Sequence, residues 1–479
     1  MTGTAIVDSY DSYDAVGLAE LVRRREVSPA ELVDAAIGRI ERLDGPINSV
    51  IHRLFDEARR QAAEPAGEGA LAGVPFLLKD LNIQYRGQRT GNGSRAWSSH
   101  VAAHDSTITE RYRAAGLIVL GFTNTAELGL ACETAPAAHG PTRNPWDLTR
   151  SVGGSTGGAA AAVATRLVPA AHGTDGGGSI RIPSAHCGVF GLKPTRGRNP
   201  FGPDLGEGWN GLSAHHAITR TVRDSAVLLD VSHGPSPGDP YAAPAFTGRY
   251  AEVIERDPAR LRVAFQTVRH DGSPIDPANA EAVRRTAALL ERLGHEVEEA
   301  RPEIDEALLK RSTRVIVASN LAHALHVRGV ALGRPVREDE VEPITWLWAQ
   351  EGARQEARAL AAAVAAVHGL GRKLGAFFQK HDILLTSTTA QPPLPLGTVD
   401  MQSRDLDAFY EALRDHSAFT SIYNSTGVPA ASVPLWWGEQ GLPLGVQIAA
   451  PLGEDARVLQ LAAQLERAEP WQDRRPPGV

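Results

Sequence analysis

Two glycine clusters and the alanine-rich run between them constrain this chain more than any other feature. The first cluster is GGSTGG at 153–158 and the second is DGGGS at 175–179, with the run 159–164 expected as a buried helix. Glycine is costly because it loses more backbone freedom on folding than any other residue. The usual gain is backbone N–H groups that can approach a ligand closely. The second cluster offers several such groups beside one hydroxyl, which is the layout of an oxyanion hole with its nucleophile.

The composition predicts a globular protein with a large core. The 479 residues are 42% apolar, enough for one large domain or two ordinary ones. The net charge of −7 is mild and the basic residues are scattered among acidic ones, so no basic face for nucleic acid is visible. Cys132 and Cys187 have no CxxC spacing, which favours buried free thiols over a disulfide framework or a zinc site.

The sequence shows no targeting signal that we recognise. The N-terminus lacks the positive start and apolar run of a secretory signal. No apolar stretch approaches the roughly 20 residues that span a bilayer. A cytoplasmic location is therefore expected.

Predicted strands alternate with predicted helices along the chain. Residues 14–65 and 303–380 are expected to be largely helical, and Ser28 to Glu31 forms a capping box with proline at the first helical position. Short apolar runs predict strands at 73–79, 116–121, 261–265, 382–386, 430–433 and 444–448, with further helices at about 106–115, 278–293 and 454–467. This alternation predicts an α/β sheet covered by helices on both sides.

One predicted strand ends on a rare residue type. Lys79 closes the run 73–79, and the only other lysines are Lys193, Lys310, Lys373 and Lys380. Two interpretations stay open from this stretch alone. The ammonium group either snorkels to solvent at the strand end, or it is desolvated, which lowers the lysine pKa and lets the side chain act as a base.

Two serines allow more than one kind of nucleophile. Residues 153–157 fit G-x-S-x-G, the nucleophile elbow of α/β-hydrolase esterases, with Ser155 as the nucleophile. That elbow needs an apolar strand directly before it, whereas residues 147–151 are mostly polar. The S-x-x-K motif of β-lactamases is absent, because no lysine has a serine three residues before it. Ser155 and Ser179, taken singly, could also serve as helix caps.

A longer set of motifs resembles the amidase signature family. The core matches are GGSTGG at 153–158, GTD at 173–175, GGSIRIP at 177–183, CGV at 187–189 and GLKPT at 191–195. Further matches are GVPFLLKD at 73–80, TNTAE at 123–127, NSTGVP at 424–429 and GLPLGVQ at 441–447. The resemblance implies an α/β fold with a large mixed β-sheet sandwiched between layers of α-helices.

Carried over residue by residue, the resemblance implies a Ser-cisSer-Lys triad of Lys79, Ser155 and Ser179. Ser179 is the expected nucleophile, Lys79 the base, and Ser155 the bridging serine after a cis peptide bond. Asp175 and Arg181 flank the nucleophile and are expected to form a structural pair. The expected oxyanion hole consists of the backbone N–H groups of Gly176, Gly177, Gly178 and Ser179.

The chain departs from the commoner family pattern at three positions. Thr156 stands where a second serine is usual, Val152 replaces a proline, and Gly176 replaces a larger residue, which is expected to loosen the oxyanion loop. SVGG at 151–154, PTRNPW at 141–146 and PW at 470–471 resemble the branch that includes the 6-aminohexanoate cyclic-dimer (nylon oligomer) hydrolases. Urethane-cleaving amidases also belong to the wider family, so synthetic amides or carbamates are expected substrates.

The expected reaction is cleavage of the C–N bond of a linear or cyclic amide through an acyl-enzyme on Ser179, with carbamates and esters also open. No cofactor or metal is expected, and the adjacent pair His215-His216, without carboxylate support, predicts a loop rather than a metal site. The expected partner is a small-molecule substrate, not nucleic acid or a membrane, in a monomer or homodimer. Two other functions stay open: the amidase-like subunit of an ammonia-transferring amidotransferase complex, and a non-catalytic scaffold of the same fold.

The expected organisation is one amidase domain over residues 1–479. It comprises N-terminal helices at 14–65, a signature core at 66–240, a variable substrate-specificity region at 265–375, and C-terminal strands and a helix at 380–475. Trp348 lies in the variable region and is one guess for the lining of the substrate pocket. The principal candidates for substrate contact are Thr125, Gly154, Trp209, Asn320 and Trp346.

Overall fold

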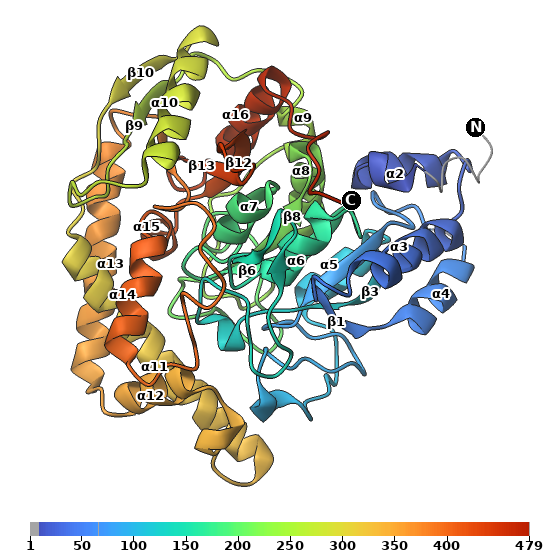
Figure 1. Cartoon of the computed structure of the whole chain (residues 1–479), viewed down its shortest axis with the longest axis horizontal. Helices are drawn as coiled ribbons and strands as arrows, with labels where there is room; N and C mark the ends of the chain where they lie inside the picture. Colours follow the sequence, from blue (N-terminus) through green and yellow to red (C-terminus); the bar gives the residue numbers. More distant parts are fainter. Residues whose placement is uncertain (1–8, 66, 479) are drawn as a thin grey trace.

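An eleven-stranded mixed sheet forms the centre of the computed structural model, which describes residues 9–65 and 67–478 (Figure 1). The strand order is β1-β3-β2-β6-β8-β7-β12-β13-β11-β9-β10. The strands are β1 (Val50–Arg53), β2 (Pro75–Lys79), β3 (Ile118–Thr123), β6 (Ala170–Asp175), β7 (Phe190–Lys193), β8 (Ala214–Thr219), β9 (Arg262–Phe265), β10 (Glu296–Glu299), β11 (Ile383–Ser387), β12 (Ala430–Trp437) and β13 (Pro443–Ala449). A separate hairpin pairs β4 (Arg143–Asn144) with β5 (Asp147–Ser151).

Helices surround this sheet. Figure 1 shows the helices of the first 65 residues at one end of the molecule and α11 to α14 at the other. The helices are α2 (Ala15–Arg23), α3 (Pro29–Leu43), α4 (Phe55–Ala63), α5 (Thr107–Ala114), α6 (Gly157–Ala164), α7 (Arg181–Cys187), α8 (Val222–Ser232), α9 (Tyr250–Val253), α10 (Pro277–Arg292), α11 (Glu306–Leu332), α12 (Pro343–Ala353), α13 (Ala357–Phe377), α14 (Leu406–His416), α15 (Ser421–Thr426) and α16 (Asp455–Ala468). Short 3₁₀ turns are η1 (Tyr10–Ser12), η2 (Arg95–Trp97), η3 (Glu127–Gly129) and η4 (Glu338–Glu340).

The strands of the C-terminal half are buried on both faces. In β11, Ile383 and Leu385 belong to the hydrophobic cluster of α8, α10 and α16, whereas Leu384 belongs to the cluster of α13 and α15. Successive side chains of a strand point to opposite faces, so an unbroken apolar run needs cover on both. These two clusters confirm the predicted sheet between layers of helices.

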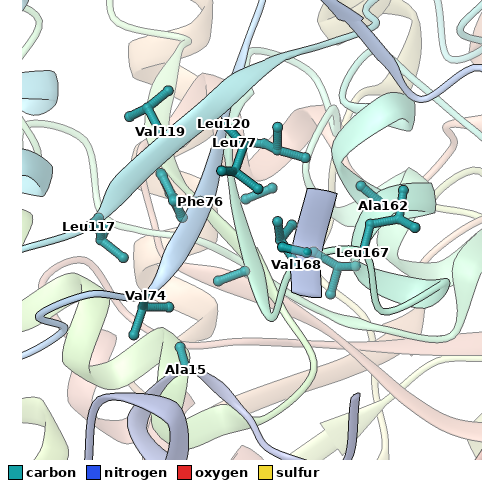
Figure 2. Close-up of a cluster of buried hydrophobic side chains, with 14 of the residues drawn as sticks. Ala15, Val74, Phe76, Leu77, Leu117, Val119, Leu120, Ala162, Leu167 and Val168 are labelled. Carbon is teal, nitrogen blue, oxygen red and sulfur yellow. The ribbon is translucent and has the colours of Figure 1, made fainter. Parts of the chain in front are cut away.

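The N-terminal half is held by a second set of apolar strands. Phe76 and Leu77 on β2 and Leu120 on β3 belong to one buried cluster with Ala162 of α6 (Figure 2). All eight residues of α6 are buried, as predicted for the alanine-rich run. A side chain on Gly158 would place its Cβ 2.4 Å from the backbone nitrogen of Asn124, so glycine allows this helix to approach the loop after β3.

Several predicted elements need correction. Residues 14–65 are not helical throughout, because Val50–Arg53 forms the edge strand β1, antiparallel to β3. His215 and His216 lie buried on β8 and not in a loop. β6, β7, β8, β10, α14 and α15 were not predicted. β6 and β8 carry alanine, glycine and histidine in place of the branched aliphatic residues that mark a strand.

The helix α11 is long and apolar enough to count as a candidate membrane span by length and composition alone. The sequence analysis had found no such stretch. In the structure α11 packs against α12 and α13, and Leu309, Ile316 and Leu321 on it are buried. The protein's own helices therefore cover much of the apolar surface of α11, although Val327 and Val330 near its end are exposed.

The parallel pairing of β2 with β6 positions the site. Leu77 pairs with Ala171, so the carboxyl ends of both strands lie at one edge of the sheet. Lys79 is the last residue of β2 and Asp175 is the last residue of β6. The second glycine cluster begins directly after Asp175, which brings the two conspicuous sequence features together at the edge where open α/β sheets bind ligands.

The close approach of α7 to β13 predicts a stability effect. A Cβ on Gly445 would lie 2.5 Å from the Cβ of Ala185 and 2.8 Å from its Cα, so Gly445→Ala should lower the free energy of unfolding by about 1–3 kcal/mol through overpacking. Gly375→Ala in α13 is the matched control, because no atom lies within 4 Å of its added Cβ. The control should be neutral or more stable by about 0.4–1 kcal/mol. Urea unfolding measures both, and equal effects would refute the packing argument.

Candidate active site

Lys79 is completely buried at the end of β2. Its Nζ lies 2.8 Å from each of three hydroxyl oxygens: Ser155 Oγ, Thr156 Oγ1 and Thr174 Oγ1. No carboxylate oxygen lies within 4.0 Å of this nitrogen in the part of the chain that the structure describes. The interpretation of a snorkelling lysine is therefore wrong, and the desolvated one holds.

The surroundings of Lys79 favour a neutral amine. Burial lowers its pKa well below the usual value, and the more distant charge of Asp175 opposes this only in part. A neutral amine has two N–H donors and one lone pair. The Thr156 hydroxyl donates its hydrogen to the carbonyl oxygen of Thr174 at 3.0 Å and so must accept from Lys79. The lone pair is then available to the Ser155 hydroxyl.

Ser155 lies in the first glycine cluster and is 1% exposed. The Gly154–Ser155 peptide bond is cis, as the family resemblance implied. A Cβ on Gly154 would lie 2.7 Å from the carbonyl oxygen of Ala131, so this glycine is required by the close approach of the loop at 131–133. The structure brings Ser155, a predicted site residue, to within 2.8 Å of the Lys79 amine.

Ser179 faces the pocket described below, and its hydroxyl makes no hydrogen bond with the described residues. The Thr156 N–H donates to the Ser179 carbonyl oxygen at 3.1 Å, which joins the two glycine clusters. Ser179 is thus held through its backbone, and its hydroxyl has no hydrogen-bond partner among the described residues.

The loop before Ser179 presents unpaired backbone donors. Within residues 9–65 and 67–478, the N–H groups of Gly176, Gly177 and Ser179 have no hydrogen-bond partner. The N–H of Gly178, which was included in the predicted oxyanion hole, instead donates to Asp175 Oδ1 at 2.7 Å. That bond shapes the loop and removes Gly178 from the set of free donors.

Asp175 and Arg181 form the structural pair expected from the sequence. Arg181 Nη2 lies 2.9 Å from Asp175 Oδ1, and both side chains are wholly buried. Burial alone raises a carboxyl pKa, but the Arg181 guanidinium holds the pKa of Asp175 below its usual range. Arg181 also donates to Gln447, Asn424 and the carbonyl of Thr420, so this ion pair ties the nucleophile loop to α15 and β13.

A pocket with about 590 Å³ of empty space, partly open to solvent, adjoins Ser179. One wall consists of Gly154, Gly176, Gly177 and Ser179 from the two glycine clusters. The other walls are Gly129, Leu130, Ala131, Cys132, Ile182, Trp209, Leu212, Thr313, Val317, Trp348, Tyr410, Leu413, Arg414, Ser417 and Ser421.

The candidates for substrate contact divide into two groups. Gly154 and Trp209 line the pocket, as does Trp348. Thr125 and Asn320 are not among the residues that line it. Thr125 is buried, and its hydroxyl donates to the carbonyl of Ala126. The side-chain amide of Asn320 donates to Asn210 and to the carbonyl of Ile316.

Trp346 is absent from the pocket because of helix geometry. Two side chains that are two residues apart on an α-helix point in directions that differ by a rotation of about 200°. Trp348 therefore faces the pocket from α12 while Trp346 lies against α11 on a separate surface hollow with Ala322 and Leu325. Of the two tryptophans that the sequence offered for the pocket lining, Trp348 lines the pocket and Trp346, the one listed for substrate contact, does not.

Sequence analysis missed the pocket residues of α14 and α15. Tyr410, Leu413 and Arg414 come from α14, and Ser421 begins α15. These residues lie more than 230 positions after the nucleophile in a segment without a motif. The only sequence signal we find for this segment is the amphipathic spacing of Phe409, Tyr410 and Leu413. This spacing predicts a packed helix, but it does not say which part of the protein the helix packs against.

Gly176 makes room for an aromatic wall. A Cβ at this position would lie 2.8 Å from ring carbons of Trp209. The missing side chain, expected to loosen the oxyanion loop, thus allows Trp209 to pack on the loop backbone. Trp209 itself adopts a left-handed backbone conformation, with φ of 56°.

Comparisons with known proteins agree with this geometry. The Amidase family profile matches residues 31–459. The chain is 42% identical over 478 residues to a 6-aminohexanoate-cyclic-dimer hydrolase of Paenarthrobacter ureafaciens, covering 97% of this chain and 96% of the relative. The chain belongs to the amidase family. It is thereby an amide-cleaving hydrolase with the amidase-signature fold, and the expected family is confirmed.

Solved structures of amidases superpose over nearly the whole chain. A 6-aminohexanoate cyclic dimer hydrolase complexed with substrate aligns with a TM-score of 0.93 at 40% identity, covering 98% of this chain and 99% of that one. A bacterial aryl acylamidase of the amidase signature family aligns with a TM-score of 0.86 at 28% identity, covering 96% of each. The amidase fold therefore extends through the variable region.

Substitutions at Thr156 test whether its hydroxyl, which contacts the Lys79 amine, matters for activity. Thr156→Val keeps the side-chain shape but removes the buried hydroxyl that accepts from Lys79 and donates to the Thr174 carbonyl, which costs about 1–3 kcal/mol and should lower kcat/KM by roughly tenfold or more. Thr156→Ser restores the hydroxyl and should stay within about threefold of the unmodified amidase. Steady-state kinetics on a simple anilide measures both. Equal rates for the valine and serine variants would show that the hydroxyl is dispensable.

Proposed function

We propose that this amidase cleaves amides through an acyl-enzyme on Ser179, with Lys79 as the base and Ser155 as the relay between them. One observation carries the proposal: the buried Lys79 amine has no ion-pair partner among the described residues and lies 2.8 Å from the Ser155 hydroxyl. A serine hydroxyl needs a base to become a nucleophile. Ser155 has a lysine and not a histidine at hydrogen-bond distance, which argues against the esterase elbow.

The proposed reaction moves one proton along this relay and back. Lys79 accepts the proton of Ser155, Ser155 accepts that of Ser179, and Ser179 Oγ attacks the amide carbon. The negative carbonyl oxygen would then accept hydrogen bonds from the free N–H groups of Gly176, Gly177 and Ser179. The proton returns through Ser155 to the leaving amine as the C–N bond breaks. Water then adds to the acyl ester by the same relay and releases the acid.

The proposed substrates are small amides with an apolar part. The pocket walls at Leu130, Trp209, Val317 and Trp348 are apolar or aromatic, and they favour such groups. The relatives that act on the 6-aminohexanoate cyclic dimer make cyclic and linear aliphatic amides the first compounds to screen. Carbamates and esters are secondary candidates, because an alkoxide or phenoxide leaving group needs less protonation than an amine.

Activity of the isolated chain separates this proposal from its alternatives. An ammonia-transferring subunit would need its partner, and a scaffold would show no turnover. Hydrolysis of a simple amide by the purified chain alone would therefore support an independent amidase.

Covalent labelling tests the triad. A small fluorophosphonate should modify Ser179 in the unmodified amidase, and Lys79→Met should slow labelling by roughly 10²–10⁴-fold because the base is lost. Peptide mapping by mass spectrometry identifies the labelled serine.

The matched control is Lys193→Met, which removes a second buried lysine whose Nζ donates to the carbonyl of Pro194 and touches neither serine. It should keep rapid labelling of Ser179. A label on Ser155, or equal labelling rates in the Lys79 and Lys193 variants, would overturn the triad.

The lowered pKa of Lys79 predicts the pH dependence. The base must be neutral, so kcat/KM should fall as pH drops through the pKa of Lys79 and protonates the amine. Because burial sets this pKa well below the usual 10.5, activity should already be on its plateau at pH values where an exposed lysine is still charged. A pH profile of kcat/KM checks this. Activity that rises continuously to pH 10.5 would contradict it.

A further inference from the structure

Arg414 is a buried cation without an anion. Its side chain lines the substrate pocket from α14 and is 4% exposed. Nη1 donates to Ser421 Oγ at 2.6 Å, whereas Nε and Nη2 are buried and have no partner. No carboxylate oxygen lies within 4.0 Å of the guanidinium in the described part of the chain. Its acidic neighbour Asp415 pairs with Arg269 instead.

Two other buried arginines near the site show what is missing. Arg181 has Asp175 at 2.9 Å, and Arg198 has Asp455 at 2.8 Å. A guanidinium stays charged in proteins, so it cannot relieve the cost of burial by losing its proton. An uncompensated buried charge is strongly unfavourable. Arg414 therefore has the environment of an ion pair from which one member is absent.

The rest of the pocket does not supply that member. Arg414 is the only charged side chain among the described residues that line it. Ser417 and Ser421 add neutral hydroxyls beside it. His270, which lies close enough for Arg414 to contribute to its low pKa, is kept neutral mainly by burial. The remaining wall residues are uncharged.

We propose that Arg414 binds a carboxylate carried by the substrate, so that the preferred substrates are open-chain amides bearing a free carboxylate beyond the scissile bond. The inference rests on the proposed function only in that the pocket beside Ser179 holds the substrate. It differs from that function by naming the charge of the substrate and the residue that selects it.

The unpaired atoms fit this ligand. Nε and Nη2 form one edge of the planar guanidinium, and their N–H groups point the same way. This is the edge that binds both oxygens of a carboxylate through two parallel hydrogen bonds. Ser421 holds the opposite edge and fixes the orientation of the fork. A neutral carbonyl would satisfy one donor and leave the charge uncompensated.

Matched anilides test the proposal. Adipic acid mono-anilide carries the carboxylate on the acyl side, N-hexanoyl-4-aminobenzoate carries it on the amine side, and hexananilide carries none. One of the two carboxylates should raise kcat/KM by about 10- to 100-fold over hexananilide, mainly through KM. Arg414→Gln should remove this preference, so that the ratio of kcat/KM for the favoured carboxylate compound to kcat/KM for hexananilide falls to about one. Arg414→Lys keeps the charge but not the planar guanidinium, so its preference for the carboxylate compound should lie between those of the unmodified amidase and Arg414→Gln.

Binding keeps the test independent of the triad. Calorimetry on the Ser179→Ala chain should show the favoured carboxylate compound binding at least about tenfold more tightly than hexananilide. Arg354→Gln, an exposed arginine at the end of α12, is the matched control and should keep the preference. Equal binding of all three compounds, or a preference that survives Arg414→Gln, would overturn the inference. Hydrolysis that persists in Ser179→Ala would instead overturn the proposed triad.

Discussion

The site depends on one buried amine. Lys79 lies at the end of β2 among three hydroxyl groups and no carboxylate, so burial favours its neutral form. Many serine hydrolases use histidine as the base. In the proposed mechanism desolvation gives Lys79 the same ability, and the fold buries this lysine at the end of the apolar strand β2, third from one edge of the eleven-stranded sheet.

The charges needed for rigidity are kept separate from this amine. Asp175 and Arg181 neutralise each other next to the nucleophile and anchor its loop to α15 and β13, while Asp175 also accepts from the Gly178 N–H. One ion pair thus shapes the loop that bears Ser179 and leaves other backbone donors free. Arg414, which lines the pocket from α14, has no such counterion among the described residues.

The candidate catalytic residues could be named from local sequence, whereas most of the pocket could not. Lys79, Ser155 and Ser179 stand in motifs whose glycines and flanking apolar runs have direct physical reasons. The pocket wall from α14 could not be predicted, because amphipathic spacing indicates a helix but not the elements that the helix packs against. Trp346 and Trp348 were indistinguishable until the rotation of α12 was known. Short strands such as β6 and β8 escaped notice because small residues and histidines replace the usual branched ones.

Direct titration of Lys79 by NMR tests the central claim most closely. The chain has only five lysines, so selective ¹³C and ¹⁵N labelling gives a simple spectrum, and Lys79→Met assigns the signal of interest. The account predicts a Lys79 amine that is neutral at pH values well below 10.5, because burial lowers its pKa. A Lys79 signal that stays charged up to pH 10.5 would contradict it.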